Sequence, residues 1–156
     1  MNKGVQTMLR QLLLLIHLLS VISWVGGMFF AYFCLRPAAV ETLDSPSRLK
    51  LWVATFARFL PYMAIAVTLL LISGITMLLS VGFQFAPVGW HIMFTLGLVM
   101  AGVYLYIYLW LFPQLRMHCA ATSWQEASQV LGAIRRFVAI NLALGLIVVI
   151  AAISAR

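Results

Sequence analysis

The sequence predicts an all-α integral membrane protein, a four-helix bundle whose helices run up, down, up and down. Hydrophobic residues make up 65% of the 156-residue chain and charged residues only 8%. The mean hydropathy is +1.08, and a soluble domain of this length needs far more charge to cover its surface. The apolar residues also fall into four separate runs, each long enough to cross a bilayer, which takes roughly 20 helical residues.

The four predicted helices lie at about 9–35, 52–80, 88–112 and 132–154, and they form a single transmembrane domain over residues 1–156. The first run follows the basic start MNKGVQTMLR, as a signal peptide would. It is too long for the apolar core of a signal peptide, however, and no small-x-small cleavage site closes it. We therefore interpret it as the first membrane helix.

The three connecting segments differ in polarity. The first, RPAAVETLDSPSRLK (36–50), holds two prolines and two of the three acidic residues and is predicted to be an aqueous loop. The second, SVGFQFAPVG (80–89), is short and uncharged, which predicts a tight hairpin. The third (113–136) is polar, and we expect a short interfacial helix at about 124–131 within it.

The basic residues indicate the orientation of the chain. One side of the membrane receives Lys3, Arg10 and Arg156. The other side receives Arg36, Arg48, Lys50, Arg58, Arg116, Arg135 and Arg136. The positive-inside rule then places both longer loops in the cytoplasm and both termini on the outer, periplasmic side of a bacterial-type inner membrane. The net charge of +7 is thus explained by the orientation of the chain in the membrane. We therefore expect lipid as a partner and no nucleic acid.

Histidines carry the main functional signal, because polar side chains inside a membrane are costly. His17 shares a helical face with Ser20, Trp24 and Gly27, at offsets of three, seven and ten. Near the start of the third predicted helix is His91, with Thr95 one turn later. The first and third helices of such a bundle run parallel. The two histidines are therefore predicted at similar depth in the outer half of the membrane.

A histidine pair of this kind can be interpreted in three ways. Each ring can simply be satisfied by a backbone carbonyl or by water. Two facing imidazoles also suit axial ligation of a haem iron inside a bundle, with Arg10, two turns above His17, placed for a propionate. Imidazole suits copper as well, although Cu(I) prefers additional thiolate or thioether ligands.

The copper hypothesis includes further side chains that could bind copper through soft ligand atoms. Its candidates along the helices are Met28, Met77 and Met93, and those at the cytoplasmic exit are Cys34, His118 and Cys119. Methionine is also ordinary filler in helix bundles, and adjacent residues on a loop are weak evidence for a site. Whether Arg58 snorkels to the interface or holds an anion is left open. We predict that Asn141 in the fourth helix forms a hydrogen bond to another helix.

Several enzyme classes are excluded by what the sequence lacks. There is no Ser/His/Asp constellation, no glycine-rich phosphate loop and no Cys-x-x-Cys pair. The three acidic residues, Glu41, Asp44 and Glu126, all fall in predicted loops. No membrane carboxylate is then available for a proton relay, which argues against an ion-coupled pump.

Two membrane families resemble this pattern. HLLSVISWVGGMFFAYFCLRPAA resembles the first helix of the copper-resistance protein D (CopD) family, in which a His precedes Trp-x-Gly-Gly and then Arg-Pro. With GWHIMFTLGLVMAGVYLY, it also resembles the HemJ-type protoporphyrinogen oxidases, which bind haem b and carry Trp-x-His-x-Lys in a later helix. Here Met93 stands at the place of that Lys. The resemblance implies a metal or haem site at His17 and His91, and it does not fix the reaction.

The sequence thus leads to a function with an alternative. We predict a haem b membrane protein with His17 and His91 as axial ligands, either a membrane oxidoreductase or an electron carrier. Its partner would be a quinone or a periplasmic redox protein. The alternative is copper transport or copper homeostasis of the CopD type, and a third reading is a structural bundle without cofactor. The oligomeric state stays open, a homo-oligomer included.

Overall fold

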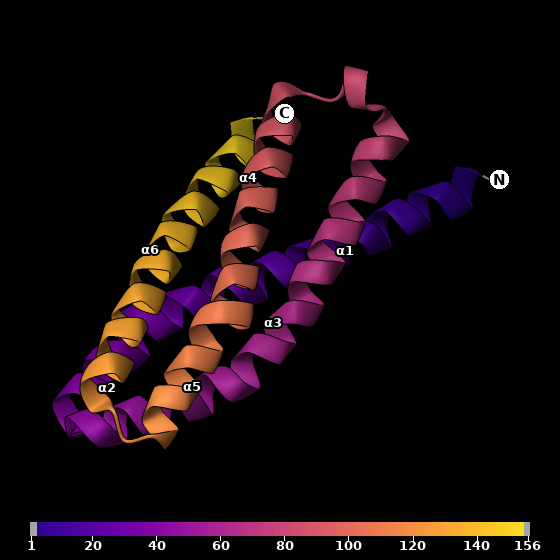
Figure 1. Ribbon diagram of the computed structural model, residues 1–156. Helices are drawn as coiled ribbons and strands as arrows, with labels where there is room; N and C mark the ends of the chain where they lie inside the picture. The colour runs from indigo at the N-terminus through magenta and orange to yellow at the C-terminus, as the bar shows by residue number, and fades with distance from the viewer. Residues whose placement is uncertain (1–2, 155–156) are drawn as a thin grey trace.

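The structure, a computed structural model, describes residues 3–154 and confirms the all-α membrane fold (Figure 1). In the described chain, four continuous helical segments are long and apolar enough to span a bilayer. The first span consists of α1 (Lys3–Phe30), the π-helical turn η1 (Ala31–Leu35) and α2 (Arg36–Thr42). The second span is α3 (Ser45–Val81), followed by a short 3₁₀ turn, η2 (Phe83–Phe85). The third span joins α4 (Val88–Tyr106), the π-helical turn η3 (Ile107–Leu111) and α5 (Phe112–Ala120), and the fourth is α6 (Trp124–Ser154).

The connections are shorter than the sequence predicts. Residues 36–42 are helical, so that only Leu43 and Asp44 separate the first two spans. The expectation of a separate interfacial helix at 124–131 is wrong, because these residues are the first turns of α6. The polar residues of both segments lie on the outer side of helices that still bury one apolar stripe. Ala39 of the first segment is 2% exposed, and Ala127 of the second is fully buried.

Two π-helical turns interrupt the parallel first and third spans at the same relative position. Each lies in a Tyr-x-x-Leu-x-Pro segment, 32–37 and 108–113. A proline cannot donate to the carbonyl four residues before it, and its ring crowds that carbonyl. The wider turn directly before each proline relieves this crowding: the N–H of Arg36 reaches back to Ala31 O, and that of Phe112 reaches back to Ile107 O.

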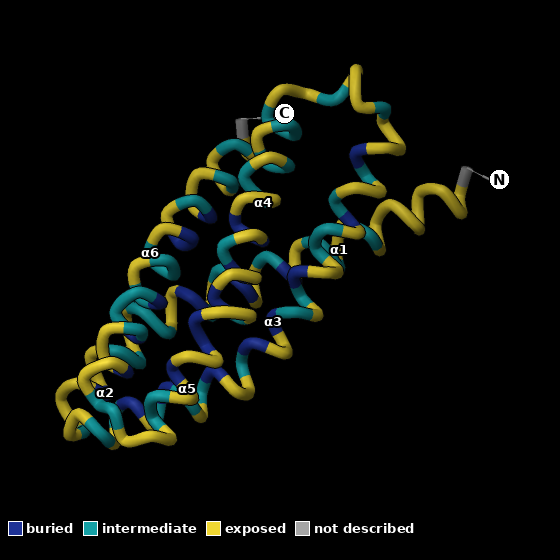
Figure 2. Tube along the Cα trace, in the orientation of Figure 1, coloured by how far each residue is buried: buried dark blue, intermediate teal, exposed yellow. Residues whose placement is uncertain are grey.

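The helices pack as two pairs, α1 along α3 and α4 along α6 (Figure 1). The N-terminal part of α1 leans away from the other helices, and residues 4–12 are all exposed (Figure 2). The tightest packing lies toward the opposite end, where Leu115, Ala127 and Ile134 have no exposed surface. Large apolar side chains cover the outside of all four spans, as expected for a surface that contacts lipid.

Candidate functional site

His17 is held by α3, the helix of the second span. Its Nδ1 lies 3.0 Å from Ser73 Oγ. Ser73 is only 1% exposed, and its hydroxyl already donates within its own helix, with Leu69 O at 2.7 Å and Leu70 O at 3.0 Å. A serine hydroxyl has one hydrogen to donate. The hydrogen between the two side chains therefore belongs to Nδ1 of His17, which donates to Ser73 Oγ.

This hydrogen bond selects the tautomer of His17. A neutral imidazole that carries its hydrogen on Nδ1 keeps a lone pair on Nε2, and this is a nitrogen that can bind a metal. Metal-ligating histidines commonly have this arrangement, in which the second ring nitrogen donates to a neighbouring oxygen. Gly74 allows the close approach, because a Cβ there would lie 3.2 Å from Cε1 of His17.

His91 has a different environment at the start of α4. Its Nε2 lies 3.0 Å from Phe83 O, and its Nδ1 lies 3.3 Å from Pro87 O. The ring also packs edge-on against the Phe83 ring, with centroids 4.6 Å apart and an interplanar angle of 88°. These contacts fasten the connection between α3 and α4 onto α4. A neutral imidazole has one N–H, so His91 donates to one of these two carbonyls, as expected for a polar residue satisfied by a backbone carbonyl, and both nitrogens lie beside carbonyl oxygens.

The two histidines therefore contact different parts of the bundle. Within residues 3–154, no hydrogen bond or ring contact joins His17 to His91. Thr95 is exposed on α4, and Arg10 is exposed on the part of α1 that leans away. A haem between the two helices would require His91 to leave the carbonyls of Phe83 and Pro87.

The predicted inward face of α1 is buried below His17. Ser20 and Trp24 are 5% and 4% exposed. The Ser20 hydroxyl donates to Ile16 O at 2.8 Å, while the Trp24 ring packs edge-on against Tyr104 of α4, with centroids 6.3 Å apart. Gly27 lies against the Phe59 ring of α3, since a Cβ there would be 2.5 Å from Cζ. This face joins α1 to both α3 and α4.

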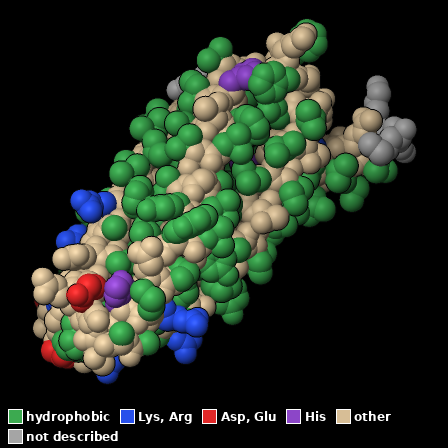
Figure 3. Space-filling view, in the orientation of Figure 1, with side chains coloured by type: hydrophobic (Ala, Val, Ile, Leu, Met, Phe, Trp, Pro, Cys, Tyr) green, Lys and Arg blue, Asp and Glu red, His purple; other side chains and the backbone are tan. Residues whose placement is uncertain are grey.

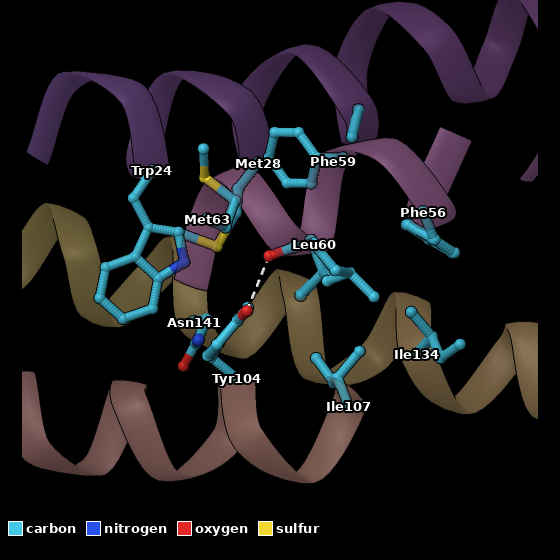
Figure 4. Close-up of a pocket in the computed structure, with 12 residues that line it drawn as sticks. Trp24, Met28, Phe56, Phe59, Leu60, Met63, Tyr104, Ile107, Ile134 and Asn141 are labelled. Atoms are coloured by element: carbon cyan, nitrogen blue, oxygen red, sulfur yellow. Dashed lines mark hydrogen bonds between the residues drawn. The ribbon is translucent and has the colours of Figure 1, made fainter. Parts of the chain in front are cut away.

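A cavity of about 40 Å³ lies next to this face, and residues from α1, η1, α3, α4, η3 and α6 line it (Figure 4). This volume is enough for one water molecule or a metal ion. Side chains of all four spans line the cavity, among them the thioethers of Met28 and Met63 (Figure 4). The predicted copper ligands Met77 and Met93 do not line it.

Asn141 of α6 is one of the residues that line the cavity. The residue is 2% exposed, and its Nδ2 donates to Met100 O of α4 at 3.1 Å, which agrees with the predicted hydrogen bond between helices. Its Oδ1 is buried and has no partner among the described residues. Tyr104 cannot supply one, because its hydroxyl donates to Leu60 O at 2.7 Å. A buried acceptor left unpaired costs about 1–3 kcal/mol.

The soft side chains at the other end of the bundle are dispersed. Cys34 is exposed on η1, and Cys119 is half-buried next to His118 at the end of α5. In the part of the chain that the structure describes, no group of three or more His, Cys, Asp or Glu could hold a metal ion.

The sequence profile of one known family, Copper resistance protein D (CopD), matches residues 53–155. The chain belongs to the CopD family. The match covers about two-thirds of this CopD protein, from α3 to the end of α6, and includes Met63, Ser73, His91 and Asn141. Comparison with curated proteins and with solved structures gives no match. Membership of the family supports a copper-resistance protein with several membrane spans.

The sequence analysis of this CopD protein named Met28 as a candidate copper ligand, but it missed Ser73 beside His17 and Met63 beside Met28. The Ser73–Gly74 pair in LLISGITM was the available signal for the partner of His17, since a buried serine beside a glycine marks a close helix contact. Met28 and Met63 are indistinguishable from packing methionines in the sequence. Their role as cavity walls depends on the packing of α1 against α3.

Proposed function

We propose that this CopD-family protein handles copper within the membrane, with Cu(I) as its cargo. The observation that supports the proposal best is the cavity between all four spans, whose lining includes the side chains of Met28 and Met63. Thioether sulfur is a soft ligand that favours Cu(I). Neutral ligands also suit a monovalent cation inside a bundle, because no buried acid is needed to hold it.

His17 supplies an additional binding point for copper on the way to this cavity. It lies on the same helix as Met28, eleven residues earlier, which is about 16 Å along the helix axis. The lone pair of its Nε2 is available because Ser73 fixes the hydrogen on Nδ1. Imidazole nitrogen binds copper in either common oxidation state. A copper ion would pass from this nitrogen to the thioethers without meeting a charged side chain.

The test measures Cu(I) affinity of the purified protein in detergent, under reducing conditions, by competition with the chromophoric chelator bicinchoninate. The double variant Met28→Leu, Met63→Leu removes both sulfur atoms and keeps the side chains apolar and of similar volume. We expect its Cu(I) affinity to fall by about tenfold or more, equivalent to ~1.4 kcal/mol. Proteoliposomes with the same variant should take up Cu(I) more slowly.

The matched control is Met100→Leu. Met100 is 3% exposed, close to the 4% of Met28 and the 7% of Met63, but it does not line the cavity. The Met100→Leu variant should bind Cu(I) with an affinity within about twofold of that of the native protein. This change is well below the tenfold that ~1.4 kcal/mol represents. The proposal is refuted if the native protein binds no Cu(I), or if the double variant and the control bind it equally well.

A haem b site between His17 and His91 is the second candidate, and the free Nε2 of His17 favours it. In this case the protein would carry electrons from a quinol to a periplasmic acceptor, and His91 would have to turn away from Phe83 O. The visible spectrum of the purified protein separates the two candidates. A Soret band that shifts on reduction and disappears in His17→Ala supports haem, whereas a colourless protein that binds Cu(I) supports copper handling.

A further inference from the structure

The two halves of the chain repeat one pattern of burial. The first hairpin runs from α1 to α3, and the second hairpin runs from α4 to α6. The π-helical turns η1 (Ala31–Leu35) and η3 (Ile107–Leu111) lie 76 residues apart. At the same spacing, buried residues of the first span correspond to buried residues of the third. The pairs are Trp24 and Met100, Met28 and Tyr104, and Ala39 and Leu115, all at most 5% exposed.

The second helices of the two hairpins correspond in the same way, at a spacing of 78 residues. The increase of two residues falls between the π-helical turns and these helices. The buried pairs are Leu49 and Ala127, Phe56 and Ile134, and Met63 and Asn141, all at most 7% exposed. Because the match holds for both helices and for the π-helical turns, we interpret the hairpins as two copies of one structural unit.

The cavity lies where the two hairpins meet. The first and third spans run parallel, so the two copies are related by an approximate two-fold axis along the membrane normal. Ten of the twelve residues that line the cavity form equivalent pairs (Figure 4). These are Met28 and Tyr104, Ala31 and Ile107, Phe56 and Ile134, Leu60 and Val138, and Met63 and Asn141. The cavity is therefore on this axis, and transporters built from repeats have their binding sites at such an interface.

Each hairpin is fastened by a hydrogen bond between its own two long helices. In the first hairpin, His17 of α1 donates to Ser73 of α3 at 3.0 Å. In the second hairpin, Asn141 of α6 donates to Met100 O of α4 at 3.1 Å. Polar contacts of this kind hold membrane helices together. Each hairpin can therefore move as one body.

A contact beside the cavity joins the two hairpins. The Tyr104 hydroxyl of the second hairpin donates to Leu60 O of the first at 2.7 Å, and the Trp24 ring packs edge-on against the Tyr104 ring. Leu60 is followed by Pro61 inside α3. A proline at such a position removes a backbone hydrogen bond and commonly kinks the helix. The contact between Tyr104 and Leu60 is thus placed to serve as a pivot.

The hairpins pack differently on the two sides of this contact. Lys and Arg side chains are concentrated at the end of the bundle that carries α2 and α5, the basic end (Figure 3). There α3 packs along α5, and the rings of Phe56 and Phe112 meet with their centroids 6.3 Å apart. Toward the opposite end, no residue is buried within 4–19, 88–99 or 146–153 (Figure 2). The hairpins are thus closed together at the basic end alone.

We infer that the two hairpins rock against each other about the contact between Tyr104 and Leu60, so that the cavity opens in turn toward each side of the membrane. The inference rests on the proposed copper function and makes the protein a Cu(I) transporter that works by alternating access. Movement of one repeat against the other around a fixed site is a common mechanism of such transporters. A simpler interpretation is that the repeat only builds the fold. It explains the matching burial, but it does not explain the unequal packing on the two sides of the cavity.

The functional test cross-links the hairpins at the basic end of the full-length protein in proteoliposomes. Lys50 of α3 lies over the Trp124 ring of α6, with its Nζ 5.7 Å from the ring centroid. The variant Lys50→Cys, Trp124→Cys, in a Cys34→Ser, Cys119→Ser background, is joined by a short bismaleimide, which reducing agents do not cleave. We expect Cu(I) uptake to fall by about tenfold or more relative to the same variant before cross-linking. Cu(I) affinity in detergent should stay within about twofold of its value before cross-linking.

The matched control places the same cross-link within the second hairpin. The backbone N–H of Ser123 donates to His118 O at 3.0 Å, so His118→Cys, Ser123→Cys joins α5 to the segment that begins α6. This cross-link should leave Cu(I) uptake unchanged, because both positions move with one hairpin. The inference is overturned if both cross-links slow uptake equally, or if the cross-link between the hairpins does not slow it.

A measurement without copper separates the movement from its cargo. Spin labels at Leu18→Cys of α1 and Ile153→Cys of α6, both exposed, report the distance between the hairpins by double electron–electron resonance. We expect two distances for this pair and one for Leu18→Cys, Ile72→Cys, which lies within the first hairpin. A single distance between the hairpins would overturn the inference and leave the copper proposal intact. Two distances in a protein that binds no Cu(I) would support the movement and refute only the copper proposal.

Discussion

The substitution Ser73→Ala tests the geometry on which the role of His17 depends. In the structure, Nδ1 of His17 donates to Ser73 Oγ over 3.0 Å, in a partly buried setting. A hydrogen bond of this kind contributes about 0.5–1.5 kcal/mol net. If 1 kcal/mol of preference for the Nδ1–H form is lost, the ratio of the two tautomers changes by roughly fivefold. The fraction of His17 that offers Nε2 as a metal ligand falls accordingly.

The assay is ¹⁵N NMR of the histidine-labelled protein, because a protonated and an unprotonated ring nitrogen have well-separated chemical shifts. Cu(I) affinity is then measured on the same sample. Removing a hydrogen-bond partner of a metal-ligating histidine commonly lowers metal affinity by about 10- to 100-fold. We expect the lower part of this range, because Leu70 O is a second acceptor close to the ring.

The matched control for this experiment is Ser80→Ala on the same helix. The Ser80 hydroxyl also donates within its helix, to Met77 O at 2.7 Å, but it is exposed and does not contact His17. It should change neither the tautomer nor the Cu(I) affinity. If Ser73→Ala leaves the ¹⁵N shifts of His17 unchanged, the hydrogen-bond direction assigned to this pair is incorrect.

Two further predictions concern stability. Gly27→Ala should destabilise the fold by about 1–3 kcal/mol in an SDS unfolding titration, because its Cβ would press on the Phe59 ring, whereas Gly26→Ala has open space and should not destabilise it. Asp44 directly precedes α3, and the hydrogen bond from the Ser47 side chain lowers the pKa of its carboxyl. Its stabilising effect is thus present above about pH 4 and is lost as the pH falls through the lower pKa of the folded protein. The difference in melting temperature between the native protein and Asp44→Asn should disappear over the same pH range; a constant difference would contradict the assignment.

The fold class could be predicted from the sequence because hydropathy reports directly on the solvent around each segment. A bilayer leaves few alternatives to helices for apolar runs of this length. The ends of the helices could not be predicted in the same way. Residues 36–42 and 124–131 are polar, yet each buries small or apolar side chains along one stripe, such as Ala39 and Ala127. Composition alone does not separate such a stripe from an aqueous loop.

The buried face of α1 could also be predicted, since helical periodicity places Ser20 and Trp24 on the side of His17. The partner of that face could not. Parallel helices suggested His91 as the partner of His17, but α1 packs along its antiparallel neighbour α3, which supplies Ser73. Hydropathy gives the number of helices and says little about which of them touch, because lipid and protein surroundings are equally apolar.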